Sequence, residues 1–103
     1  MNLLPENATK IDVENATVDF FTYTRNDVTY YQFDTSMCEP PEPMVNAMIG
    51  LKLIDSTDHK LVMINHKKPM GLLEKISQDY DIYTEYLDDG HIKLIFSCKN
   101  VRD

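Results

Sequence analysis

Two short stretches hold the residue types that could do chemistry, and each precedes an apolar segment with helical spacing. In the first, residues 37–44 (MCEPPEPM), Cys38 lies just ahead of three prolines. In the second, residues 65–70 (NHKKPM), His66 is followed by two lysines and a proline. A thiol near a helix N-terminus is polarised toward the thiolate and is reactive if it is exposed. We therefore take Cys38 as a candidate nucleophile and His66 as the centre of a second candidate site.

Thiol chemistry is the first of three functions that these residues could serve. Cys38 could accept sulfur as a persulfide and pass it on, with the thiolate favoured by Lys67, Lys68 or protonated His66. Glu39 and Glu42 oppose this function, because a carboxylate repels a thiolate.

Metal ligation and protein docking are the other two functions. Cys38, His66 and His91 could ligate a soft metal, although the chain contains no CxxC or HxxxH spacing. Alternatively, the same region is a protein-docking surface without chemistry of its own, and no cofactor is expected. Each residue also has a structural alternative. Asn65 and His66 could cap a helix whose entry Pro69 sets, or could hold the loop by hydrogen bonds. His91 could simply begin a strand.

Conventional enzyme catalysis has little support in the sequence. No nucleophile has a recognisable base and orienting partner, and no phosphate-binding loop is present. A carrier or binding module therefore fits these residues better than a stand-alone enzyme does.

The hydrophobic pattern predicts the elements that position these residues. Strands are expected where β-branched and aromatic residues gather or alternate, and helices where apolar residues form a stripe. The expected strands cover residues 18–24, 28–34, 60–65, 81–87 and 91–98, and the expected helices cover residues 44–54 and 70–79. The Asp-Gly pair between the last two strands is a strong hairpin signal. The order β-β-α-β-α-β-β indicates an α+β fold, a two-layer sandwich with helices on one face of a mixed sheet.

Length and charge limit the classes of function. The chain of 103 residues can form one domain with a modest core, which we place at residues 18–103. Residues 1–17 are mostly polar and are expected to form a flexible arm, although Ile11 and Val13 could form a short edge strand. The net charge of −7 disfavours binding to nucleic acid or to anionic membranes. An exposed aromatic edge near Tyr23 or Tyr30 could permit a homodimer.

The expected compartment is the cytoplasm. No apolar run approaches the length of a membrane span, and the N-terminus lacks the pattern of a secretory signal. In a reducing compartment Cys38 and Cys98 should both be free thiols.

The residues at the two expected strand-to-helix junctions resemble those of a known group of folds. PEPMV (residues 41–45) resembles the Cys-Pro-x-Pro junction of TusA-like sulfur carriers. NHKKPMGLL (residues 65–73) resembles the Asn/Asp-His-x-x-Pro-x-x-Leu signature of a related group of small bacterial domains of unknown function. The likeness covers roughly residues 29–98, and its second stretch is the more specific one. The chain thus resembles the SirA/TusA-like fold and is most similar to the uncharacterised group.

This resemblance implies a shared edge for the candidate residues. In that fold the first three strands of the family are parallel, and the last is antiparallel and lies between the second and the third. The loops after the first two strands and the Asp-Gly hairpin would then meet at one edge, with Cys38, His66 and His91 on the same side. Cys98 would lie at the opposite edge, so no disulfide is expected.

The resemblance also implies a function. It suggests a sulfur carrier or thiol relay in which Cys38 is the persulfide thiol and the partners are proteins that donate or accept sulfur. The alternative is a non-enzymatic protein-interaction or metal/cofactor-binding module centred on His66, with Lys67, Lys68 and Pro69 in its binding site. In the carriers the cysteine directly precedes Pro-x-Pro. Here a proline occupies that position, and the thiol lies two residues further upstream.

Overall fold

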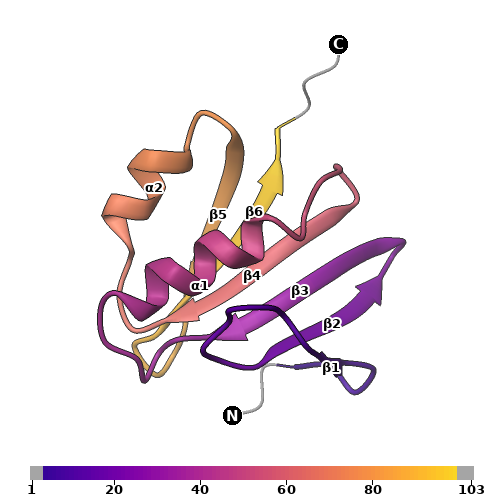
Figure 1. Cartoon of the computed structure of the whole chain (residues 1–103), viewed down its shortest axis with the longest axis horizontal. Coiled ribbons are helices and arrows are strands. Elements are labelled where there is room, and N and C mark those ends of the chain that lie inside the picture. The colour runs from indigo at the N-terminus through magenta and orange to yellow at the C-terminus, as the bar shows by residue number, and fades with distance from the viewer. Residues whose placement is uncertain (1–3, 100–103) are drawn as a thin grey trace.

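The computed structural model describes residues 4–99, and it combines a six-stranded sheet with two helices (Figure 1). In chain order the elements are β1 (Thr9–Ile11), β2 (Phe20–Arg25), β3 (Val28–Asp34), α1 (Glu42–Leu51), β4 (His59–Asn65), α2 (Met70–Ile76), β5 (Tyr80–Tyr86) and β6 (Ile92–Cys98). Neither helix is long and apolar enough to cross a membrane, a statement that covers these described residues alone. The predicted α+β class is confirmed.

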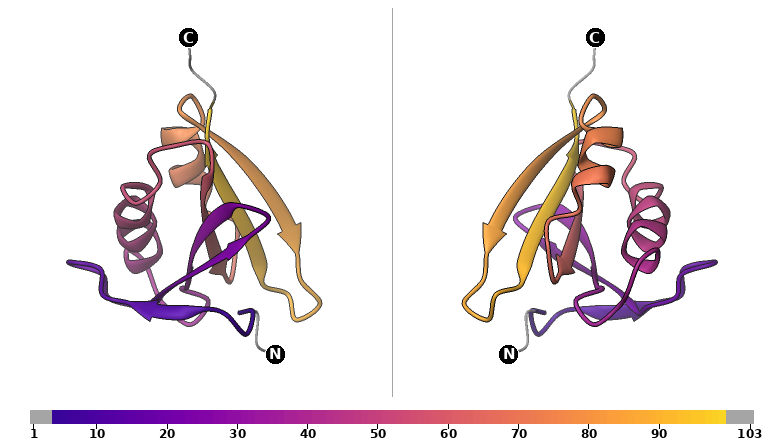
Figure 2. Two further views of the ribbon diagram at one scale, coloured as in Figure 1. Left: turned by 90° about the vertical axis from the view of Figure 1, so that its right-hand side faces the viewer. Right: turned by 90° about the vertical axis from the view of Figure 1, so that its left-hand side faces the viewer.

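The sheet is mixed, and its strand order is β1-β2-β3-β4-β6-β5. Strands β3 and β4 are parallel, and the other neighbouring pairs are antiparallel. Both helices pack on the same side of the strongly twisted sheet (Figure 2). The parallel pair follows from the crossover through α1, because a connection of that length can return the chain to the same end of the sheet.

Two hairpins flank the parallel pair, as the turn residues predict. Asn26 and Asp27 join β2 to β3 with φ values of 54° and 68°, the left-handed conformation that a two-residue type I′ turn requires. Gly90 has a φ of 88° in the turn between β5 and β6. In that turn the backbone N–H of Leu87 donates to the carbonyl of His91 at 2.9 Å.

The core lies between the helices and the covered face of the sheet. Its largest buried side chains come from the central strands, where the rings of Phe20 and Phe33 stack with their centroids 4.9 Å apart. Gly50 of α1 lies directly over this layer. A Cβ atom built on Gly50 would be 2.7 Å from Leu61 Cδ1 and 3.1 Å from Phe20 Cε2. The helix can therefore approach the sheet closely only because this residue has no side chain.

The helix boundaries differ from the prediction in a consistent way. Helix α1 begins at Glu42, two residues before the apolar stripe, and Pro43 lies in its first turn, where proline is well tolerated. Both helices end three residues early. Beyond Leu51 the backbone forms hydrogen bonds between residues three apart, such as the one that the Ile54 N–H donates to the Leu51 carbonyl. At the end of α2 the Asp79 N–H donates to the Ile76 carbonyl in the same way.

The N-terminal segment packs against the rest of the domain, although its polar composition indicated a flexible arm. Strand β1 pairs with β2, and Val13 and Ala16 pack against the core. Asn46 of α1 is fully buried, and its side-chain amide accepts from the backbone N–H of Thr17 at 2.9 Å and donates to the Thr17 hydroxyl at 2.8 Å. Residues 1–3 of the expected flexible arm lie outside the described residues. From residue 4 on, the arm contributes a strand and a buried polar network.

Candidate functional site

The two strand-to-helix junctions lie side by side. Strands β3 and β4 are parallel neighbours, so the loops that follow Asp34 and Asn65 leave the sheet at the same edge (Figure 1). The backbone N–H of Thr35 donates to the carbonyl of Ile64 at 2.8 Å, which extends the ladder by one residue. The buried Thr35 hydroxyl lies 3.0 Å from Asn65 Oδ1. These bonds fix the start of one loop against the start of the other.

Asn65 anchors the second junction from inside. Its side chain is buried, and Nδ2 donates to the carbonyl of Lys67 at 2.9 Å while Oδ1 accepts from the Thr35 hydroxyl. Both ends of the buried amide are thus paired, as burial of a polar group demands. Helix α2 has no side-chain cap, and Pro69 occupies its N-cap position. Asn65 therefore holds the loop by hydrogen bonds, as the structural alternative proposed, and does not cap the helix.

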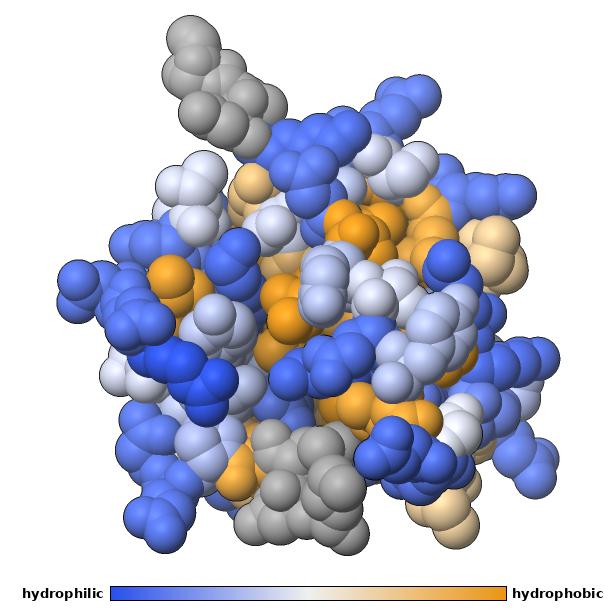
Figure 3. All heavy atoms as spheres, turned by 180° about the vertical axis from the view of Figure 1, so that it is seen from behind, coloured by the Kyte–Doolittle hydropathy of each residue, from blue (hydrophilic) through white to orange (hydrophobic). Residues whose placement is uncertain are grey.

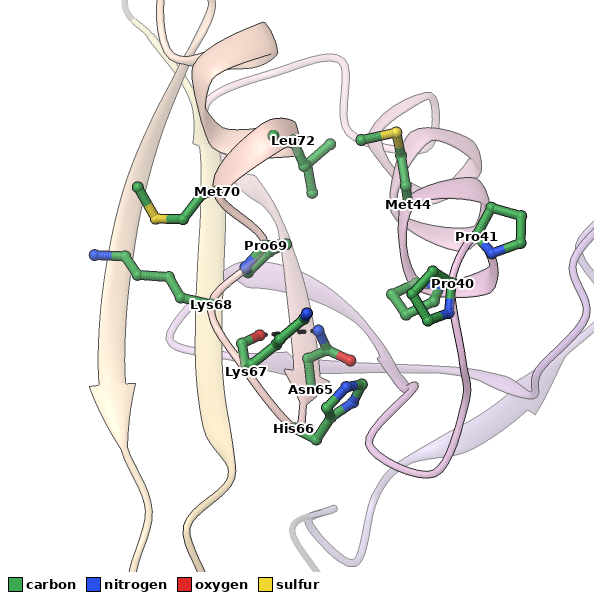
Figure 4. A pocket seen from close by; sticks show the side chains of 12 residues that line it. Pro40, Pro41, Met44, Asn65, His66, Lys67, Lys68, Pro69, Met70 and Leu72 are labelled. Atoms are coloured by element: carbon green, nitrogen blue, oxygen red, sulfur yellow. Dashed lines mark hydrogen bonds between the residues drawn. The ribbon is translucent and has the colours of Figure 1, made fainter.

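A pocket of about 530 Å³ lies between the starts of the two helices (Figure 4). The β3–α1 side supplies Pro40, Pro41, Pro43 and Met44, and the β4–α2 side supplies Asn65, His66, Lys67, Lys68, Pro69, Met70, Gly71 and Leu72. Its lining is mostly prolines, methionines and leucine, and it contains no acidic residue. Met44 reaches toward α2, since a Cβ atom built on Gly71 would lie 3.8 Å from Met44 Cε. A volume in this range suits a small ligand or a large side chain.

The polar lining of the pocket is basic. His66, Lys67 and Lys68 are all exposed, and none of the three forms an ion pair with another residue of the described 4–99 range. The chain as a whole carries a charge of −7. Two lysines without an ion-pair partner among the described residues, in a protein of net negative charge, attract a negatively charged group to this end of the sheet.

Cys38 lies outside this pocket, on the loop that leads to α1. Its thiol is partly buried, and its backbone N–H donates to the carbonyl of Thr35 at 2.9 Å. Burial raises the pKa of the Cys38 thiol, and the carboxylate of Glu42, a hydrogen bond to that carboxylate and the charge of Asp34 raise it further. The thiol is therefore protonated at neutral pH. Burial is the largest of these causes, and Glu42 opposes the thiolate as expected of a neighbouring carboxylate.

His91 is also outside the pocket. It follows the turn between β5 and β6, where its Nδ1 lies 3.2 Å from Asp89 Oδ2 and its backbone N–H donates to Asp89 Oδ1 at 3.0 Å. In the described part of the chain, no group of three or more His, Cys, Asp or Glu side chains is placed to hold a metal ion. Cys38, His66 and His91 share an edge of the sheet but do not converge as ligands.

Sequence reasoning found four of the twelve residues that line the pocket. It selected His66, Lys67, Lys68 and Pro69, whereas it treated Met44 and the other apolar lining residues as core or as a fold junction. The available signal was the parallel pairing that the resemblance implies, because two helices that start from adjacent parallel strands bring their first turns together. The second cysteine, Cys98, is free and donates through Sγ to the carbonyl of Ile54 at 3.4 Å, at the opposite end of the strands from the pocket.

Comparisons with other proteins add no assignment to this geometry. No family model, curated protein or solved structure matches the chain. The function has to be argued from the pocket and from the charges around it.

Proposed function

We propose that the protein is a non-enzymatic binding module whose pocket receives an apolar side chain of a partner protein. The observation that carries this proposal is the pocket between the starts of α1 and α2. Its lining is mostly apolar, and His66, Lys67 and Lys68 form a basic rim. Met44 and Met70 are 40% and 56% exposed, so large apolar side chains stand open to solvent at this site. Methionine adapts its shape to an incoming group, which is why it is common at binding surfaces.

The basic rim specifies the partner's chemistry further. An apolar side chain that enters the pocket brings its flanking residues close to Lys67, Lys68 and His66. Acidic flanking residues would pair with the two lysines, whereas basic flanking residues would be repelled. The preferred partner segment is therefore an apolar or aromatic residue between acidic residues.

Methionine methyl resonances give a direct test. The probe is an acetylated, amidated peptide of sequence DDLFDD, with KKLFKK as its charge-reversed control. Binding in the pocket shifts the methyl signals of Met44 and Met70 and leaves that of Met37, which is 91% exposed and outside the pocket, in place. The proposal fails if neither pocket methyl moves at millimolar DDLFDD, or if KKLFKK moves both equally.

One pocket-filling variant and two double charge reversals separate binding in the pocket from a general effect of charge. Gly71→Leu fills the pocket and should abolish the shift of the Met44 signal. Reversal of both rim lysines, Lys67→Glu with Lys68→Glu, should weaken the binding of DDLFDD. The matched control reverses two exposed lysines elsewhere, Lys52→Glu with Lys75→Glu, and should change the affinity much less.

The SirA/TusA-like arrangement belongs to this proposal as its structural part. Its support is the strand order, in which β6 lies between β4 and β5 and runs antiparallel to both, while β3 and β4 are parallel. The resemblance implies that arrangement for the corresponding four strands. Two unpaired cysteines suit a reducing compartment such as the cytoplasm.

A thiol relay through Cys38 is the second candidate function. It is favoured by the position of Cys38 beside the start of α1 and by the resemblance, and it is weakened by the raised pKa of the thiol. Incubation with a cysteine desulfurase and cysteine, followed by mass spectrometry, tests it. An adduct of one sulfur atom that disappears in Cys38→Ser and persists in Cys98→Ser supports the relay, and the absence of any adduct on Cys38 contradicts it.

A further inference from the structure

Strand β5 is a long free edge of the sheet. Its seven residues, Tyr80–Tyr86, pair with β6 in an unbroken register, and no other strand in the described part of the chain pairs with its outer side. The opposite edge, β1, has three residues. An edge strand leaves the N–H and C=O groups of alternate residues unpaired, so it can accept one more strand. β5 contains no proline, bulge or lysine that would block this pairing.

The side chains on the outer strand form an alternating acidic pattern. Asp81, Tyr83 and Glu85 point to the face that no helix covers, since they pair across the sheet with β6 residues of that face. Tyr83 is 60% exposed. Neither Asp81 nor Glu85 is in an ion pair with another described residue. Figure 3 shows this open face, on which apolar side chains lie among charged ones.

A second copy of the chain is a poor occupant of this edge. A two-fold antiparallel pairing that joins all seven residues must be centred on Tyr83. It would place Asp81 of each copy opposite Glu85 of the other, twice. Like charges directly opposite one another destabilise a strand pair. The same geometry makes a basic strand complementary at both positions.

We propose that β5 binds an extended, basic segment of a partner protein as an added strand. The segment carries Lys or Arg at two positions four residues apart, which face Asp81 and Glu85. An aromatic or β-branched residue midway between them faces Tyr83. The residues in between face Ile82 and Thr84 on the helix side of the sheet, where β-branched side chains fit. Backbone hydrogen bonds supply the pairing, and the two charges supply the choice of partner.

The test uses the full chain and the peptide TKVYVKT, with TEVYVET as the charge-reversed control. Titration followed by amide NMR should shift the signals of residues 80–86, slow hydrogen exchange on the outer side of β5, and leave the Met44 and Met70 methyl signals unchanged. Two further peptides, N-methylated on alternate residues, test the strand pairing. One of them should lose binding and the other retain it, because only one set of N–H groups faces β5.

Matched variants test the charge pattern. Asp81→Asn with Glu85→Gln should weaken the binding of TKVYVKT by about two- to thirtyfold, the range expected from two exposed ion pairs. The control, Glu74→Gln with Asp88→Asn, makes the same change in net charge outside β5 and should leave the affinity within about twofold of the unaltered chain. Asp81→Lys with Glu85→Lys should transfer the preference to TEVYVET.

Four results would overturn the inference. They are unshifted β5 amides at millimolar TKVYVKT, equal binding of both peptides, equal effects of the β5 and control variants, and self-association of the unaltered chain through β5. The inference is independent of the pocket. A chain that binds DDLFDD and ignores TKVYVKT would contradict the added strand alone.

Discussion

Gly50→Ala measures how closely α1 approaches the sheet. In an exposed helix this substitution would stabilise the protein by about 1 kcal/mol, because alanine has the higher helix propensity. Here the new methyl group would lie 2.7 Å from Leu61 Cδ1 and 3.1 Å from Phe20 Cε2, and both side chains are buried. Overpacking of a core costs about 1–3 kcal/mol. The net expectation is a loss of about 1 kcal/mol, or about 4–8 °C in the thermal midpoint of a domain near this size.

The assay is chemical and thermal unfolding followed by circular dichroism, and the matched control is Gly71→Ala. A Cβ atom on Gly71 meets only Met44 Cε, at an ordinary 3.8 Å, so this variant should gain a few tenths of a kcal/mol to about 1 kcal/mol. The double variant, Gly50→Ala with Leu61→Val, should lose less stability than the sum of the losses of the two single variants. The expected difference is at least about 0.5 kcal/mol in the free energy of unfolding. A Gly50→Ala protein more stable than the unaltered chain would refute the close approach.

The remaining predictions concern buried polar groups and pH. Asn46→Ala should lower the free energy of unfolding by about 1–3 kcal/mol and expose the Thr17 amide to hydrogen exchange, because the buried amide of Asn46 bonds to Thr17. Asn7→Ala removes an exposed bond to the Thr24 carbonyl and should cost much less; equal losses would contradict this difference. The raised pKa values of Cys38, Cys98, Tyr23 and Tyr80 mean that the folded state holds these protons more tightly. Stability should therefore fall as the pH rises from about 8.5, where an unfolded cysteine begins to lose its proton, toward 11, and urea midpoints that stay constant over this range would contradict it. Glu42→Gln should lower the pKa of Cys38 and speed its alkylation at pH 8, an effect that Glu39→Gln should not share.

The regular elements could be predicted because their residues repeat at the periods of strands and helices. The two hairpins also follow from turn residues that tolerate a positive φ, Asn26 and Asp27 in one and Gly90 in the other. The helix ends could not be read in the same way. Leu53 and Ile54 continue the apolar pattern of α1 and are partly or fully buried, but they pack from a turn beyond the helix.

The position of the candidate site could be predicted, but the residues that line it could not. Parallel pairing of the strands that end near Asp34 and Asn65 places two loops together, and the resemblance implied this pairing. Which side chains line the space depends on how each loop bends. The β3–α1 loop places Cys38 beside Glu42, the first residue of α1, so the most reactive residue type in the region lies outside the pocket.

The buried role of Asn46 was equally hidden. Asparagine within a helical stripe gives no sign of burial, and its partner, Thr17, lies 29 residues away in a polar segment. Such a contact arises only when the N-terminal segment packs against the first turns of α1. The local spacing of apolar residues contains no information on this long-range contact.

The central position of β4 has a consequence for the order of folding. Each of the two hairpins, β2–β3 and β5–β6, joins strands that are adjacent in sequence, whereas β4 pairs with strands from both and is connected to neither by a tight turn. The hairpins can close quickly over short loops. The pairing of β4 with β3 must wait until the crossover is formed, since long loops carry the larger entropic cost. We expect docking of β4 to be the event that joins two local units into one cooperative domain, and the pocket at its end to appear only with that last step.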